Sequence, residues 1–224
     1  VGVNYRSEAD GAARVVETIT TAGGQALAIH ADVSDGAAVT AMVEQVVQRF
    51  GGLDILVNNA GIEHAAPFLE KSLEDWNRVL AVNLTGPFLC TQAAARVMVH
   101  AKKPGTIINI SSVHEDLPFP GHTDYCAAKG GLRMLCRNLA LELAPYGITV
   151  VNVGPGAIAT PINRATLEDP RLLATLEHEI PLHRVGEADE VAQLVAYLAS
   201  DAARYITGTT IFIDGGLMRQ TGSL

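Results

Sequence analysis

The sequence predicts an α/β protein built around a doubly wound parallel sheet. Short apolar runs alternate with longer helical segments from one end of the chain to the other. Hydrophobic residues make up 48% of the 224 residues and charged residues only 18%, which suits a sheet with helices on both faces. Strands that are apolar throughout and alternate with helices indicate right-handed βαβ units. We therefore expect a single domain over residues 1–224.

The elements follow one another in a regular order. Ser7 is a candidate N-cap of the first helix, and Gly23 and Gly24 would end it. Residues 160–185 have a weaker periodicity and three prolines, which predicts a helical insertion or lid within the domain. The apolar runs predict strands over residues 1–5, 26–32, 53–61, 105–112, 147–156 and 209–216. The intervening segments predict helices over residues 7–22, up to 50, 73–100, 124–144 and 187–200.

Charge and cysteine content exclude several classes of protein. The net charge of −8, with no basic run, argues against a nucleic-acid partner. We find no apolar stretch long enough to span a bilayer and no secretory leader, so no membrane partner is expected. Cys90, Cys126 and Cys136 form no CxxC pair, so we expect neither disulfides nor a metal site. A small-molecule substrate and a cytoplasmic location are the expectation.

Tyr125 and Lys129 lie four residues apart at the start of an expected helix, so they share one face. A tyrosine with an ordinary pKa of about 10 is a poor base near neutrality. A neighbouring ammonium group lowers that pKa, which suits proton transfer to or from an alcohol oxygen. Ser112 ends an expected strand, where open α/β sheets bind ligands, and its hydroxyl would hold the same oxygen. An isolated Tyr-x-x-x-Lys pair is weak evidence, so its weight depends on other motifs.

Those other motifs make the sequence resemble the short-chain dehydrogenase/reductase family from residue 1 to about residue 218. They are "NNAG" (58–61), "NLTG" (83–86), "SS" (111–112), "YCAAK" (125–129) and "PGAIAT" (155–160). The resemblance implies a Rossmann-like fold, a nicotinamide cofactor and a hydride transfer between the cofactor and an alcohol or carbonyl. It implies the catalytic set Asn83, Ser112, Tyr125 and Lys129.

The resemblance also assigns a role to each catalytic residue. Tyr125 would be the general acid or base, and Lys129 would lower its pKa and bind the nicotinamide ribose. Ser112 would orient the reacting oxygen, and its rival Ser111 lacks the family's spacing of thirteen residues before the tyrosine. Asn83 would hold a water that links Lys129 to solvent. Its alternative is a polar residue that kinks the helix through local backbone bonds.

The residues expected near the adenosine ribose favour NADP(H), with NAD(H) as the alternative. A carboxylate at position 6 would accept bonds from the ribose 2′-hydroxyl and repel a 2′-phosphate. The sequence has Arg6 and Ser7 there, and arginine pairs well with phosphate. Asp32 and Val33 match the family's adenine-binding pair, although Asp32 has the alternative of capping the next helix. The cofactor residues that the resemblance implies are Arg6, Ser7, Asp32, Val33, Asn59, Ala60, Gly61, Tyr125, Lys129, Pro155, Gly156, Ile158 and Thr160.

Within the family, the resemblance is strongest to bacterial glucose 1-dehydrogenases. The shared words are "NYRS", "SSVHE", "AAKGG", "LALELAP", "GPGAIATPIN" and "IPLHRVGE". A sugar needs further polar partners, and His114 and Glu63 are the candidates beside Ser112 and Tyr125. The stretch "DLPFPGHTDY" departs from the pattern of the glucose dehydrogenases. The alternatives to glucose as the substrate are therefore a different sugar, a polyol or a bulkier carbonyl compound. A 3-oxoacyl-thioester reductase is the alternative enzyme.

The opening "VGVNYR" corresponds to the second strand of this family. The preceding strand, glycine-rich turn and helix amount to on the order of 30 residues. We expect the sequence to be an N-terminally incomplete stretch of an ordinary enzyme. The alternative is a truncated scaffold that binds no cofactor and has no activity, whose sheet would carry unpaired backbone groups beside an apolar trough. The resemblance also implies a homotetramer.

Overall fold

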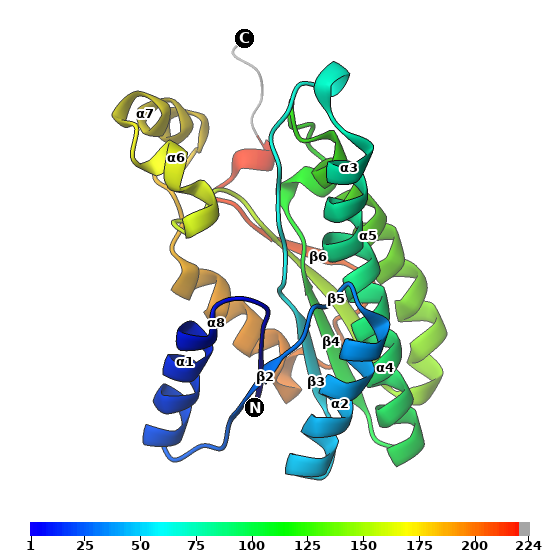
Figure 1. Ribbon diagram of the computed structural model, residues 1–224. Coiled ribbons are helices and arrows are strands. Elements are labelled where there is room, and N and C mark those ends of the chain that lie inside the picture. Colours follow the sequence, from blue (N-terminus) through cyan, green and yellow to red (C-terminus); the bar gives the residue numbers. More distant parts are fainter. Residues whose placement is uncertain (220–224) are drawn as a thin grey trace.

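The computed structural model describes residues 1–219 and contains six strands with helices on both sides (Figure 1). Residues 220–224 of the expected domain lie outside the described residues. The strands are β1 (Gly2–Tyr5), β2 (Leu27–His30), β3 (Ile55–Asn58), β4 (Gly105–Ile110), β5 (Ile148–Pro155) and β6 (Thr210–Ile213). The helices are α1 (Ala9–Thr21), α2 (Gly36–Phe50), α3 (Leu73–Leu80), α4 (Gly86–Ala101), α5 (Thr123–Leu143), α6 (Arg164–Leu167), α7 (Pro170–Glu179) and α8 (Ala188–Leu198).

All strand pairs are parallel, as the apolar runs predict, and they form two sheets. One sheet pairs β1 with β2, and the other has the order β3-β4-β5-β6. A groove of about 620 Å³ separates β1 from β3 and is lined largely by apolar side chains. Ile55 and Val57 of β3 are 43% and 40% exposed there, although they belong to a strand. The two sheets therefore face each other across an apolar groove.

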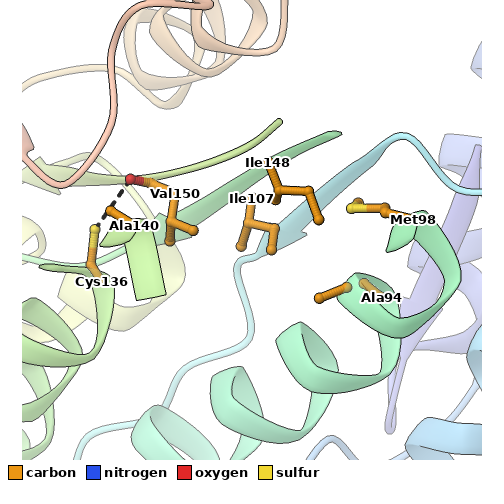
Figure 2. Packing of buried hydrophobic residues seen from close by; sticks show 8 residues of the cluster. Ala94, Met98, Ile107, Cys136, Ala140, Ile148 and Val150 are labelled. Carbon is orange, nitrogen blue, oxygen red and sulfur yellow. Dashed lines mark hydrogen bonds between the residues drawn. The ribbon is translucent and has the colours of Figure 1, made fainter. Parts of the chain in front are cut away.

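The four-stranded sheet is covered on both faces. On one face, Met98 of α4 and Cys136 of α5 pack on Ile107 and Val150, and all four are at most 1% exposed (Figure 2). On the other face, α8 packs its Leu198 against strands β4 and β5. Fully burying an aliphatic side chain of this size stabilises the fold by about 1.5–3 kcal/mol. Alternate residues of each strand thus enter two separate hydrophobic clusters.

A row of buried amides crosses the face of the sheet that α4 covers. Asn58 of β3 donates to Thr91 of α4 (3.0 Å) and to the side chain of Asn109 on β4 (2.8 Å). Asn109 donates in turn to Asn152 of β5 at 2.9 Å. The three asparagines are register partners on adjacent strands, at most 8% exposed. Their mutual hydrogen bonds remove most of the free-energy cost of burying three amides.

The structure corrects two local predictions. Ser7 is not the N-cap of α1, because the helix begins after Glu8, which makes no side-chain cap hydrogen bond. The helix expected over residues 73–100 is divided by a π-helical segment, Ala81–Thr85, between α3 and α4. Asn83 lies in that segment, so its neighbourhood departs from regular helix geometry. Its side chain bonds the backbone of Ile62, 21 residues away, so the alternative of local backbone bonds is wrong.

The segment expected to be a helical insertion contains α6 and α7. These helices lie between β5 and α8 in the sequence and away from the sheet in Figure 1. Asp169 caps α7 by accepting hydrogen bonds from the backbone of Arg171 and Leu172. In residues 1–219, no helix is both long enough and apolar enough to cross a bilayer.

Candidate active site

The predicted site residues follow the carboxyl ends of parallel strands, where open α/β sheets bind ligands. Arg6 follows β1, Asn59 follows β3, Ser112 follows β4 and Gly156 follows β5. Strands of one parallel sheet end at the same edge, so Asn59, Ser112 and Gly156 come from neighbouring segments. The groove between the sheets is lined by Val33 on one side and by Asn59 and Ala60 on the other.

Tyr125 and Lys129 lie on the first turns of α5 and face the end of β4. The Lys129 ammonium nitrogen lies 5.4 Å from the centre of the Tyr125 ring and donates to the Ile110 carbonyl at 2.8 Å. The Ser112 hydroxyl accepts from the backbone of His114 at 3.1 Å and lies close enough to the Tyr125 side chain to lower its pKa. The structure therefore brings Ser112, Tyr125 and Lys129 together.

Burial dominates the titration of this centre. It raises the pKa of Tyr125 to about 12, while the Ser112 hydrogen bond acts in the opposite direction. It also lowers the pKa of Lys129 to about 8, and the Glu115 carboxyl group opposes that fall. The sequence predicts a Tyr125 pKa lowered by Lys129, but in this structure burial raises that pKa, so the prediction is wrong.

Asn83 fastens the loop that follows "NNAG" to the π-helical segment. Its amide nitrogen donates to the Ile62 carbonyl at 2.7 Å, and its amide oxygen accepts from the Ile62 backbone at 2.9 Å. A β-carbon at Gly61 would lie 3.4 Å from that oxygen, so the loop approaches Asn83 closely. The side chain is fully buried. Its role as holder of a water beside Lys129 stays a prediction.

The end of β1 carries the residues expected to read the cofactor's ribose. The Arg6 guanidinium lies 4.0 Å from the Asp32 carboxylate, and both side chains are over one-third exposed. Hydrogen bonds from the Ser34 hydroxyl and backbone lower the pKa of Asp32, with a smaller contribution from Arg6. Asp32 does not cap α2, because Asp35 does so, which makes the capping alternative wrong. Ser7 is exposed beside this pair.

The turn after β5 has room only for its glycine. A β-carbon at Gly156 would lie 2.8 Å from the Asp214 α-carbon, so Pro155 and Gly156 run against the chain that follows β6. Ile158 is buried and pairs with Gly186 in an isolated bridge, whereas Thr160 is half-buried and donates to the Ile158 carbonyl at 3.4 Å. The Ile158 side chain packs within the protein, and its carbonyl also accepts a hydrogen bond from the Asn163 side chain at 2.8 Å.

Three stacked rings form one wall beside Tyr125. Phe119 lies between His114 and His122, with ring centres 4.2 Å and 3.8 Å away, and His114 also meets Tyr125 edge-on at 6.3 Å. Burial lowers the pKa of His114, which favours its neutral ring. Burial raises the pKa of half-buried Glu63, whose charge in turn raises the pKa of Tyr125. Both predicted substrate residues thus lie in the surroundings of Tyr125.

Sequence reasoning missed a buried ion pair next to the tyrosine. The Lys71 ammonium lies 3.0 Å and 3.1 Å from the two carboxylate oxygens of Asp124 and donates to the His64 carbonyl at 2.5 Å. The side chains are 4% and 0% exposed. Asp124 also accepts from the Tyr125 backbone at 3.0 Å. Nothing in the spacing of Lys71 and Asp124, 53 residues apart, indicates the pair.

A Rossmann-like sheet with a buried tyrosine, lysine and serine at its carboxyl edge defines the class of α/β oxidoreductases that act on alcohols and carbonyls. Comparisons with known proteins narrow that class. Residues 1–218 match a family model described as "Enoyl-(Acyl carrier protein) reductase". The chain is 49% identical to 3beta-hydroxysteroid dehydrogenase 1 of Eggerthella lenta over 99% of its length and 85% of that protein's.

A second curated relative and a solved structure are also similar to this chain. Glucose 1-dehydrogenase 2 of Bacillus subtilis is 42% identical over 97% of this chain and 84% of that protein. The crystal structure of a gluconate 5-dehydrogenase from Burkholderia cenocepacia, in complex with NADP and tartrate, superposes with a TM-score of 0.92. It is 37% identical and covers 98% of this chain and 86% of that one. The chain belongs to the short-chain dehydrogenase/reductase family.

Proposed function

We propose that this protein transfers a hydride between NADP(H) and a sugar or polyol, with Ser112 and Tyr125 as its acid–base centre. The observation that carries the proposal is the buried cluster of Ser112, Tyr125 and Lys129, because a phenol, a hydroxyl and an ammonium group meet at the ligand-binding edge of the sheet. Glu63 and His114 lie beside it and would contact further hydroxyls of the substrate.

The chemistry of the centre follows from these groups. Ser112 and Tyr125 would hold the substrate oxygen between their hydroxyls. A bound nicotinamide would accept the hydride that the alcohol carbon loses on oxidation, and Tyr125, as its phenolate, would take the proton from the alcohol oxygen. Lys129 stabilises that phenolate electrostatically. In the reverse direction, Tyr125 donates its proton to the carbonyl oxygen.

The residues at the strand ends fit a dinucleotide. Arg6 offers a guanidinium to a 2′-phosphate, and Asp32 offers a carboxylate to the adenine amino group. The turn after β5, which Gly156 lets pack closely on Asp214, would face the nicotinamide, with Thr160 beside it. We propose that the remaining contacts come from Ser7, Val33, Asn59, Ala60, Gly61, Tyr125, Lys129, Pro155 and Ile158.

Arg6→Asp is expected to reverse the preference for NADP over NAD. The Michaelis constant for NADP should rise about tenfold or more, because a carboxylate repels the 2′-phosphate and a charge-assisted hydrogen bond contributes about 1.5–3 kcal/mol. Initial rates with each cofactor measure this change. Arg14→Asp, which alters an exposed arginine of α1, is the charge-matched control. An unchanged constant for NADP in the Arg6 variant would show that NADP selection lies elsewhere.

A panel of aldoses, polyols, hydroxysteroids and 3-oxoacyl thioesters tests the substrate class. Absorbance follows NADPH formation with the aldoses, polyols and hydroxysteroids, and NADPH consumption with the 3-oxoacyl thioesters. The rate should be highest with an aldose or polyol. The 3-oxoacyl thioester reductase is the second candidate, because the matching family model is described as a reductase of carrier-bound acyl groups. The net charge of −8 disfavours docking of an acidic carrier protein. Absence of turnover on every aldose and polyol would remove the sugar proposal.

We further propose a homotetramer and a substrate lid over residues 160–185. Met134 and Leu141 of α5 are 60% and 78% exposed, which supports a partner surface on this helix. The helices α6 and α7 stand away from the sheet, as a lid would. Size-exclusion chromatography tests the assembly.

A further inference from the structure

Glu115 holds a fully buried carboxyl group directly behind the serine turn. Its two oxygens accept short hydrogen bonds from the hydroxyls of Ser111 and Thr210, both at 2.5 Å, and one accepts from Asn152 at 3.4 Å. The Arg133 guanidinium nitrogen lies 3.9 Å away. Every one of these partners can donate, which matches the acceptor-only character of an ionised carboxylate.

The Glu115 carboxylate and the Lys129 ammonium group bond neighbouring residues at the end of β4. Lys129 donates to the carbonyl of Ile110, and the next residue, Ser111, donates to Glu115. The ammonium and the carboxylate therefore contact adjacent residues of one short stretch of backbone. Glu115 raises the pKa of Lys129 against the effect of burial. The other charged or titratable groups around this centre include Tyr125, Arg133 and Cys136 on α5, Asp116 on the turn after Glu115, and Glu63 on the loop after β3.

We propose that Glu115 is a positioning residue of the active site, whose buried negative charge keeps Lys129 in its ammonium form. Its hydrogen bonds also hold the Ser111–Ser112 turn against β5 and β6. The proposal rests on the proposed function in that Lys129 and Tyr125 are taken to act in catalysis. A buried ammonium group loses its proton easily unless an opposite charge lies nearby. Glu115 supplies that charge without touching the substrate.

The direct test is the titration of Lys129 by NMR in protein labelled at the lysine ε-carbons. The chain contains four lysines, and a Lys129→Arg sample assigns the signal. In Glu115→Gln, which keeps the shape of the side chain and removes its charge, the pKa of Lys129 should fall by about one unit or more. Asp116→Asn removes the neighbouring carboxylate and is the matched control. The same Lys129 pKa in Glu115→Gln and the unsubstituted protein would overturn the proposal.

Kinetics supply the second readout. At a pH near 7, the turnover number for alcohol oxidation in Glu115→Gln should fall about twofold if the Lys129 pKa falls from about 8 to about 7, and about tenfold for each further unit. The Michaelis constant should stay within about twofold, and Glu115→Asp should recover part of the rate. The NMR titration needs no substrate. If the proposed function is wrong, turnover is absent in both Glu115→Gln and the unsubstituted protein, and the comparison of their Lys129 pKa values still decides the role of Glu115.

Arg133→Met keeps the proposal testable if Glu115→Gln does not fold. Arg133 is the cation that faces Glu115, and its side chain is 30% exposed, so its replacement is better tolerated than a change within the buried cluster. Without this competing cation, Glu115 acts more strongly on Lys129, and the pKa of Lys129 should rise. A fall or no change in Arg133→Met would overturn the electrostatic role.

Discussion

Tyr125→Phe should lower the turnover number by about 10²–10⁴-fold, the usual contribution of a positioned general acid or base. The variant loses the phenolic proton but keeps a ring of nearly the same shape. Tyr125 is buried against Ser112 and Lys129, so the remaining packing is retained. Nicotinamide absorbance at saturating substrate measures the effect, and urea unfolding verifies that the fold is intact.

Tyr205→Phe is the matched control for this change, because Tyr205 is fully exposed. It should leave turnover unchanged. Tyr125→Phe activity above one-tenth of that of the unsubstituted protein would exclude Tyr125 as the proton donor. The high pKa of Tyr125, about 12, adds a pH signature: alcohol oxidation needs the phenolate, so its rate should increase toward alkaline pH.

Lys71→Met should lower the free energy of unfolding by about 3–5 kcal/mol, because it leaves Asp124 buried without its cation. The Asp124 side chain is 0% exposed and accepts two of its hydrogen bonds from Lys71. Chemical denaturation in urea, with the midpoint and slope both recorded, measures this loss.

Two further variants separate charge from packing. Lys103→Met removes an exposed lysine and should change stability by less than about 0.5 kcal/mol. The double variant Lys71→Met with Asp124→Leu removes both charges and should be more stable than Lys71→Met alone, since an apolar pair of similar volume often replaces a buried ion pair without loss. If the double variant is the less stable of the two, the cost of Lys71→Met does not come from an unpaired carboxylate.

The parallel sheet and the pairing of Tyr125 with Lys129 could be predicted from the sequence. Runs such as "GTIINI" and "ITVVNVGP" are apolar on both faces of the strand, which indicates burial between helices, and both are strands with partners on each side. Tyr125 and Lys129 share a helix face because of local geometry alone, and the structure places them so. Because the helix that carries them follows the strand that ends near Ser112, the order of elements along the chain also predicts that Tyr125 and Lys129 lie beside Ser112.

The missed features depend on contacts between distant segments. Glu115 reaches Thr210, 95 residues away, and Lys71 reaches Asp124, 53 residues away. No periodicity relates such positions, so neither partner can be deduced before the fold is known. The π-helical segment around Asn83 is a third case. The bonds of Asn83 to Ile62 join this segment to the loop after β3, and the approach of the two depends on tertiary packing.

The row of asparagines across the sheet also limits how the strands can pair. The same strands carry Ile108 and Val151 on their opposite face, against α8. A shift of one strand by a single residue would turn its asparagine into that apolar cluster and separate it from the amides of its neighbours. Apolar side chains of similar size would tolerate such a slip, whereas Asn58, Asn109 and Asn152 would each lose hydrogen-bond partners. The amides therefore select one alignment of β3, β4 and β5 during folding, and that alignment sets where each strand ends beneath the active site.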